Sequence, residues 1–249
     1  MKDVRVCEHL AQVAPRLDRM TLLRTVHHDV IDEHSAAVNR MHTGRPVSGT
    51  VVFPSVGSII SHQCPAPQGI PPYVLLGYPT GARGPGFLGP RHGFLYLTDT
   101  SRGPAGLSRP ATVSDARHQR RRGLLDTVRR SSLEGTVESD PRRAYDAVID
   151  ESDALASGRF RRVFELDREG PDLRTRYGSE FGQRCLLARR LVERGVRFVE
   201  VLHNLNFSNG TGWDTHNEGQ RQQHVLFREL DAALATLIDD LEEKRLLDK

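Results

Sequence analysis

The C-terminal part of the chain carries the pattern that most constrains the fold. Residues 179–195, "SEFGQRCLLARRLVERG", place apolar residues at helical spacing and end at Gly195, a residue type that is common at helix ends. Residues 196–203, "VRFVEVLH", concentrate β-branched and aromatic residues and indicate a strand. Residues 218–247 then show the pattern of a long amphipathic helix. A helix, a strand and a helix in this order are typical of one turn of a parallel α/β sheet.

The N-terminal part predicts three shorter elements. Residues 8–18, "EHLAQVAPRLD", are expected to form a short helix. Residues 20–28, "MTLLRTVHH", look like a strand that ends in two histidines. Residues 29–44 suit a helix that is closed by Gly44.

Histidines are concentrated in this N-terminal part, at His27, His28, His34 and His42. His34 shares one face of the expected helix with apolar residues, namely Val30, Val38 and Met41. We therefore expect the side chain of His34 to point into the fold. In such a place a histidine is either a buried residue with satisfied hydrogen bonds or a ligand.

The middle of the chain divides into two regions of different composition. Residues 45–110 are rich in glycine and proline and contain short apolar runs at 72–77 and 93–97, which predicts loops and short strands. Residues 111–176 are dense in arginine and are expected to form helices in pieces. No internal repeat is visible, and at 249 residues one large α/β domain is as plausible as two small ones.

The cysteines and the hydropathy exclude several classes of protein. The three cysteines, Cys7, Cys64 and Cys185, are far apart, so neither a zinc knuckle nor a disulfide framework is supported. No segment approaches the roughly 18 apolar residues that a membrane span needs. The start, "MKDVRVCEHL", lacks the apolar stretch of a signal peptide. The sequence as written therefore predicts a cytoplasmic protein with no membrane partner.

The basic residues are almost all arginine, since only three of the 35 are lysines (Lys2, Lys244 and Lys249). Arginine can bind phosphate, sulfate or carboxylate through two hydrogen bonds, although a biased base composition also produces such a surplus. Aspartates and glutamates are interleaved with the arginines of residues 111–176, and the net charge is only +3. These features favour solvated helix faces, so nucleic acid is not the expected partner.

Residues 210–219, "GTGWDTHNEG", are the segment that most directly suggests chemistry. Side chains two residues apart in an extended segment project to the same side, so Asp214 and His216 can converge on one point. A carboxylate oxygen and an imidazole nitrogen are common ligands of zinc, manganese or iron, and Trp213 could form a wall of such a site. The same segment also fits a helix start with Asp214 as the N-cap. The spacing alone leaves both interpretations open.

Other catalytic arrangements find little support. No Ser-His-Asp or Cys-His constellation can be assembled from the spacing of these residue types. The glycine-rich run "GARGPGFLG" (81–89) neither follows a clear strand nor opens a helix, so it does not match a nucleotide-binding loop.

Six segments taken together are more specific than any one of them. They are "LAQVAPRLDRMTLLRTVHH", "HSAAVNRMHTG", "FPSVGSII", "GPGFLGP", "RYGSEFGQRCLLARRLVERGVRFVEV" and the "GTGWDTHNEG" segment. In this order they resemble the bacterial domain-of-unknown-function-1501 family, and the resemblance runs nearly from end to end. Members of that family are similar to sulfatases and to the alkaline phosphatase superfamily.

The resemblance implies a three-layer α/β/α sandwich around a largely parallel sheet, with a metal site at the strand ends. Residues 1–249 would then be a single, partial sulfatase-like α/β domain, in which the arginine-rich residues 111–176 are a helical insertion. Superfamily relatives use one or two divalent ions to hydrolyse phosphate or sulfate esters. By position, Asp214 and His216 match the family's Asp-Thr-His and are the implied metal ligands, while His34 matches a further family histidine. The implied cofactor is a divalent metal (zinc, manganese or calcium). The implied substrate is a small-molecule or polysaccharide ester.

The chain departs from the family's pattern at both ends. Family members usually begin with an export signal and a glycine-rich segment that carries an aspartate, and they continue past "RLLD" into another strand and an Asp-His motif. We therefore expect an internal piece of a longer domain, with an incomplete sheet, whose full-length relatives are exported. The alternatives to a hydrolase are a non-catalytic remnant and an anion- or nucleic-acid-binding protein that uses residues 117–176.

Overall fold

A three-stranded, all-parallel sheet lies at the centre of a mixed α/β fold, in the order β2–β1–β3. The strands are β1 (Tyr73–Leu76), β2 (Leu95–Leu97) and β3 (Phe198–Val201). The structure is a computed structural model, and it describes residues 4–101, 103–104, 107, 110–133, 140–155, 160–203, 212–213, 215 and 219–248. The strands expected within 72–77, 93–97 and 196–203 are confirmed.

Strand β1 is the centre of the sheet and pairs with both neighbours. Val74 lies opposite Leu95 of β2 and opposite Val199 of β3. All four residues of β1 are buried, as is usual for a parallel strand that is covered on both faces. The burial therefore requires helices above and below the sheet.

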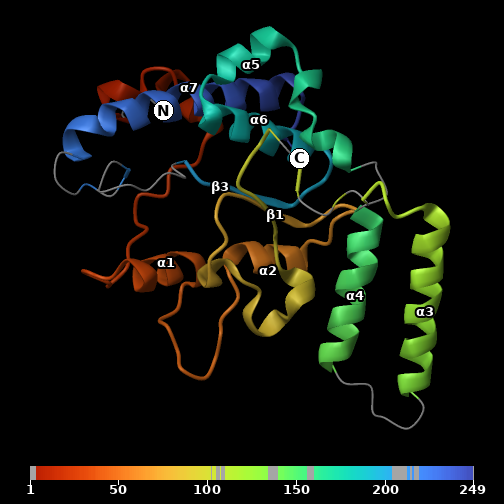
Figure 1. Cartoon of the computed structure of the whole chain (residues 1–249). Coiled ribbons are helices and arrows are strands. Elements are labelled where there is room, and N and C mark those ends of the chain that lie inside the picture. Colours follow the sequence, from red (N-terminus) through yellow and green to blue (C-terminus); the bar gives the residue numbers. More distant parts are fainter. Residues whose placement is uncertain are drawn as a thin grey trace.

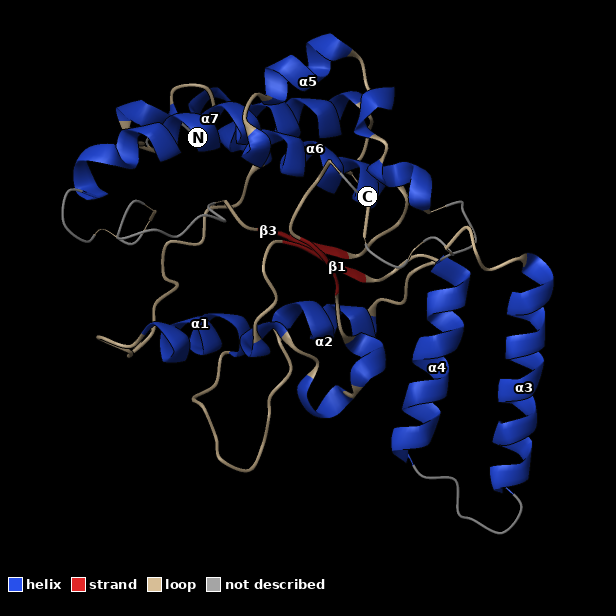
Figure 2. Cartoon of the chain, viewed as in Figure 1, coloured by secondary structure: helices blue, strands red, loops and turns tan. Residues whose placement is uncertain are grey.

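Helices lie over both faces of the sheet (Figure 1; Figure 2). On one side are α5 (Pro171–Tyr177), α6 (Glu180–Glu193) and α7 (Gly219–Glu243). On the other side are α1 (His34–Thr43) and α2 (Val56–Gln63). The two long helices predicted in the C-terminal part are confirmed as α6 and α7.

The main hydrophobic core lies between the sheet and α6. Val74 and Leu76 of β1 belong to the same buried cluster as Leu186, Leu187 and Leu191 of α6. Side chains alternate between the two faces of a strand, so the other two residues of β1 face the opposite layer. Removal of this apolar surface from water is the main force that holds α6 on the sheet.

On the opposite face, α2 approaches the sheet through a glycine. A Cβ atom on Gly57 would lie only 2.6 Å from the ring of Tyr73 and 2.7 Å from the ring of Phe198, so no larger side chain fits without a shift. Ser55 caps the helix by accepting a hydrogen bond from the backbone N–H of Ser58 (3.3 Å). This helix lies in the region 45–110, where only loops and short strands were predicted, because it is only 8 residues long and the glycines and prolines around it favour loops.

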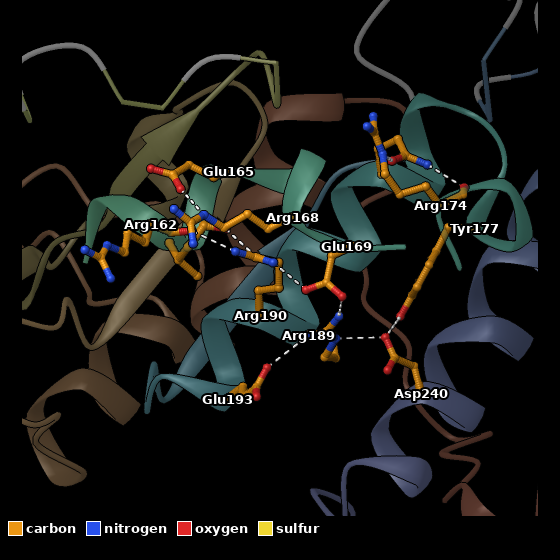
Figure 3. Close-up of polar contacts among 12 residues, drawn as sticks. Arg162, Glu165, Arg168, Glu169, Arg174, Tyr177, Arg189, Arg190, Glu193 and Asp240 are labelled. Atoms are coloured by element: carbon orange, nitrogen blue, oxygen red, sulfur yellow. Dashed lines mark hydrogen bonds and ion pairs between the residues drawn. The ribbon is translucent and has the colours of Figure 1, made fainter. Parts of the chain in front are cut away.

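A polar network lies between α6, α7 and the segment before α5 (Figure 3). The Arg189 guanidinium is 1% exposed and contacts three carboxylates: Asp240 at 2.8 Å, Glu169 at 2.9 Å and Glu193 at 2.8 Å. The Tyr177 hydroxyl donates a further hydrogen bond to Asp240 (2.9 Å). The network joins three segments that are distant in the sequence.

A helical hairpin of α3 (Asp115–Leu133) and α4 (Asp140–Leu155) extends away from the sheet (Figure 2). Ion pairs connect its helices: Arg122 contacts Asp150 at 2.8 Å, and Arg129 contacts Asp146 at 2.8 Å. The expectation that residues 111–176 form helices in pieces is confirmed by α3 and α4.

The N-terminal segment packs along α7, but not as the single helix predicted for 8–18. It forms two 3-10 helices, Glu8–Leu10 and Ala14–Arg19. Pro15 has no backbone N–H and stands in the first turn of the second helix, which prevents a continuous helix. The Asp231 carboxylate accepts the N–H groups between the helices, at 2.9 Å from Gln12 N and 2.8 Å from Val13 N.

The strand predicted for residues 20–28 is wrong, because this segment is irregular. Leu23 is 73% exposed and Val26 is 58% exposed, so the apolar residues that suggested a strand have no layer to pack against. Helix α1 also begins later than predicted, at His34, where the Glu33 side chain accepts hydrogen bonds from Ser35 N (2.8 Å) and Ala36 N (2.5 Å). Its predicted end is confirmed.

The remaining helical elements are short. The described residues contain further 3-10 helices at Gly81–Arg83, Gly86–Leu88, Pro90–His92, Arg161–Phe164 and Leu166–Arg168. Within the part of the chain that the structure describes, no helix has the length and apolar character needed to cross a membrane.

The buried network predicts a large effect of a single substitution. Asp240→Ala removes a carboxylate that is 2% exposed and leaves part of the Arg189 charge uncompensated. We expect the free energy of unfolding, measured by urea denaturation, to fall by about 3 kcal/mol, because breaking a buried pair leaves a desolvated charge. Asp167→Ala is the matched control, since this carboxylate contacts Arg174 but is 94% exposed. Equal urea midpoints for the two variants would contradict a structural role of the network.

Candidate functional site at the carboxyl edge of the sheet

The carboxyl ends of the parallel strands meet along one edge, which is formed by residues 77–80, 98–101 and 202–203 and is called the carboxyl edge here. Helix α6 runs into β3 and α7 follows it, so both helices begin near this edge. In parallel α/β folds, ligands bind outside the carboxyl ends of the strands.

Trp213 connects the "GTGWDTHNEG" segment to this edge. Its indole Nε1–H donates a hydrogen bond to Nδ1 of His203 (3.2 Å), the second residue after β3. The indole ring also packs edge-on against Phe227 of α7, with ring centroids 5.1 Å apart. Trp213 precedes Asp214 in the chain, whereas Asp214 and His216 themselves lie outside the described residues.

His203 is enclosed on several sides. Its ring stacks on Phe181 of α6, with centroids 4.0 Å apart, and Nε2 lies 3.1 Å from the Glu229 carboxylate of α7. An indole N–H can only donate, so Nδ1 of His203 must be the unprotonated nitrogen and Nε2 carries the hydrogen that Glu229 accepts. Burial lowers the pKa of His203, an effect that its hydrogen bond to Glu229 opposes only partly. The neutral ring therefore holds Trp213 in place near neutral pH.

Arg184 of α6 fixes the backbone at the end of β3. Its guanidinium is 4% exposed and donates hydrogen bonds to the carbonyl oxygens of Leu202 and His203, the latter at 3.1 Å. Glu180, one turn earlier in α6, lies 3.7 Å from this guanidinium. Burial lowers the pKa of Arg184. The strand end and the first turn of α6 are thus held together.

A second polar group, centred on Glu200, faces the opposite side of β3. The Glu200 carboxylate accepts hydrogen bonds from Arg83 (2.6 Å) and Tyr73 (2.8 Å) and lies 3.0 Å from Nε2 of His42 in α1. Burial acts to raise the pKa of Glu200, but the hydrogen bonds from His42, Arg83 and Tyr73 outweigh it and lower the pKa to about 2. A carboxylate so strongly held in its charged form is a poor general base.

The same contacts affect the other members of this group. The hydrogen bond to Glu200 raises the pKa of His42 despite its partial burial. Burial raises the pKa of Tyr73, and the Glu200 charge adds to this effect. We interpret the group as a structural link between α1 and the sheet.

His34 does not point into the fold as expected. It is the first residue of α1 and is exposed, and no residue of α1 is fully buried. The histidine of this helix that reaches the sheet is His42, two turns later. The expected face was wrong because the helix starts at His34, so Val30 lies outside it.

Sequence reasoning missed His203, Glu229 and Glu200 as candidate residues. A signal existed for His203, because it ends the predicted strand and directly precedes the loop of interest. Glu229 and Glu200 gave no such signal, since their partners are distant in the sequence.

A cleft of about 660 Å³ opens beside this site at the start of α6. Thr100 and Ser101 line it after β2, and Glu180 and Gln183 line it from α6, together with Arg161 and Arg174. Glu180 is next to Phe181, whose ring stacks on His203, so the cleft and the His203 group are neighbours. Among the described residues, no acidic side chain lies within ion-pair distance of Arg161.

The fold and the edge define a parallel α/β protein with a polar, histidine-containing group at the carboxyl ends of its strands. The chain belongs to the family described as "Protein of unknown function (DUF1501)", whose sequence profile matches residues 1–249. The expected family membership is thereby confirmed. No curated protein and no solved structure matches the chain.

The Glu200 group predicts a pH-dependent stability. The pKa of Glu200 falls from its usual value of 4.5 to about 2 on folding. Its stabilisation is therefore complete above pH 4.5 and is lost as the pH falls towards 2. We expect Glu200→Gln to lower the free energy of unfolding by about 2 kcal/mol at pH 7 and by much less at pH 3, as measured by urea denaturation. A difference that does not change with pH would contradict this role.

The single tryptophan allows a direct measurement on His203. Protonation of Nδ1 removes the acceptor of the Trp213 hydrogen bond, so Trp213 fluorescence should change in one transition with a midpoint below 6.5. We expect His203→Gln to abolish the transition and Glu229→Gln to lower its midpoint, because Glu229 raises the pKa of His203. His224→Gln, in the exposed part of α7, is the matched control and should leave the transition unchanged.

Proposed function

We propose that this protein is a metal-dependent hydrolase of sulfate or phosphate esters, with Asp214 and His216 as metal ligands. The observation that carries the proposal is the hydrogen bond from Trp213 to His203 (3.2 Å), because it fixes the residue before Asp214 at the end of β3. A ligand-bearing segment beside the carboxyl end of a parallel strand is a common arrangement in α/β enzymes. The three-layer α/β/α fold of the sulfatase-like proteins is part of the same proposal.

A carboxylate and an imidazole are a donor set that fits zinc, manganese or calcium. When bound, such an ion would polarise the ester oxygen of the substrate. His34 is proposed as a further ligand on the family resemblance alone. The substrate is a small-molecule or polysaccharide ester.

Arg161 and Arg174 provide the chemistry that an anionic ester requires. Both line the cleft at the start of α6, and a guanidinium can donate two parallel hydrogen bonds to a sulfate or phosphate group. Arg174 is already held by Asp167 (2.5 Å) and Gln183 (3.2 Å). Arg161 is therefore the better candidate to bind the anion.

The arginines of the α3–α4 hairpin do not favour the alternative function, which is the binding of nucleic acid or other anions. Arg122 and Arg129 contact aspartates of α4, so their charges are compensated within the hairpin. Compensated arginines attract a polyanion only weakly.

The hydrolase proposal is tested with Zn²⁺ and Mn²⁺ titrations and with the chromogenic esters p-nitrophenyl sulfate and p-nitrophenyl phosphate. We expect metal-dependent hydrolysis of one ester. Asp214→Ala and His216→Ala should each lower the metal affinity by at least roughly tenfold, because each removes a ligand. Asp18→Ala and His224→Ala are the matched controls and should leave both properties unchanged, because both side chains are exposed and neither lines the cleft. Metal affinity that does not depend on Asp214, together with no hydrolysis of either ester, would contradict the proposal and support a non-catalytic remnant.

A further inference from the structure

Three consecutive residues at the start of the first 3-10 helix bring together three kinds of metal ligand. The thiol of Cys7, the carboxylate of Glu8 and a ring nitrogen of His9 all lie within 4.8 Å of one another. Among the residues that the structure describes, this is the group of three potential ligands that meets this distance. All three side chains are exposed, so an ion from solution can reach them.

The separations suit a tetrahedral zinc ion. Zinc binds thiolate sulfur at about 2.3 Å and imidazole nitrogen or carboxylate oxygen at about 2.0–2.2 Å. Tetrahedral geometry then places the ligand atoms about 3.3–3.6 Å from one another. The Cys7 sulfur and the Glu8 carboxylate oxygen are already 3.6 Å apart. Only small side-chain movements are needed for His9 to complete a three-ligand set.

The backbone that carries these ligands is well anchored. Asp231 holds the N–H groups of Gln12 and Val13, and Arg16 forms two hydrogen bonds with Asp239 of α7, at 2.6 Å and 2.5 Å. His9 itself stacks on Phe227, with ring centroids 6.0 Å apart. A fixed backbone lowers the entropy cost of bringing the ligands together.

We propose that Cys7, Glu8 and His9 form a zinc-binding site with one coordination position open to solvent. Three protein ligands and a free fourth position are the arrangement of catalytic zinc sites, whereas structural sites use four protein ligands. Phe227 contacts both His9 and Trp213, so the site lies beside the candidate functional edge. It shares no residue with the proposed Asp214–His216 site and does not depend on that proposal.

Cobalt substitution tests the site, because a thiolate bound to Co²⁺ gives a charge-transfer band in the near ultraviolet. We expect the full-length protein titrated with Co²⁺ alone to show this band, with an intensity that saturates at one thiolate-bound ion per chain, and Zn²⁺ to remove it by displacement. Cys7→Ser should abolish the band. Cys64→Ser is the matched control, since Cys64 is also an exposed free cysteine, and it should keep the band.

Two further variants separate a three-ligand site from a lone thiol. Glu8→Gln and His9→Gln should each weaken Co²⁺ binding by roughly tenfold or more, since each removes a ligand. Asp214→Ala should leave the band unchanged, because the proposed hydrolase site has no sulfur ligand. Absence of the band, its persistence in Cys7→Ser, or unchanged affinity in both ligand variants would overturn the zinc-site proposal without bearing on the hydrolase proposal.

Discussion

The contact between Arg189 and Asp240 is the interaction on which the rest of the structure depends. Both groups are almost completely buried, and a buried charge is tolerated only when it is paired and hydrogen-bonded. Arg189 also contacts Glu169 and Glu193, while Tyr177 donates to Asp240. These contacts join α6, α7, the segment before α5 and the end of α5. The ion pairs thus add directional contacts to the hydrophobic packing of these helices on the sheet.

The position of these helices determines the geometry at the carboxyl edge. Helix α6 supplies the ring of Phe181 and the guanidinium of Arg184, and α7 supplies Phe227 and Glu229. Each of these contacts His203, its backbone or Trp213. The polar network and the His203 group therefore lie on the same two helices. A shift of α7 along α6 would separate Glu229 from His203 and would remove the partner that orients its ring.

The sequence predicted the elements whose pattern is local. Helices α6 and α7 and strand β3 have clear periods and end signals, and all three are confirmed. The predicted strand 20–28 failed because its apolar residues are exposed, and exposure is set by neighbouring segments that the local pattern does not describe. The site was less predictable than the fold. His203 marks the end of a predicted strand, but its partner Glu229 lies 26 residues away, and His42 and Glu200 are separated by 158 residues.

The structure explains part of the excess of arginine over lysine. Arg189 contacts three carboxylates, Arg83 joins Glu200 to Thr80, and Arg190 donates to the carbonyl oxygens of Val163 (2.7 Å) and Arg162 (2.7 Å). A guanidinium presents five donors in a rigid plane, so one side chain can link several segments at once, whereas a lysine ammonium is a single point charge. The arginine content suggested that the protein binds anions. In the described residues, however, these guanidinium groups mainly contact carboxylates and carbonyl groups of the protein itself. Arg161 differs in lining the cleft with no such carboxylate partner among those residues, which is why we propose Arg161 as the residue that would bind a substrate anion.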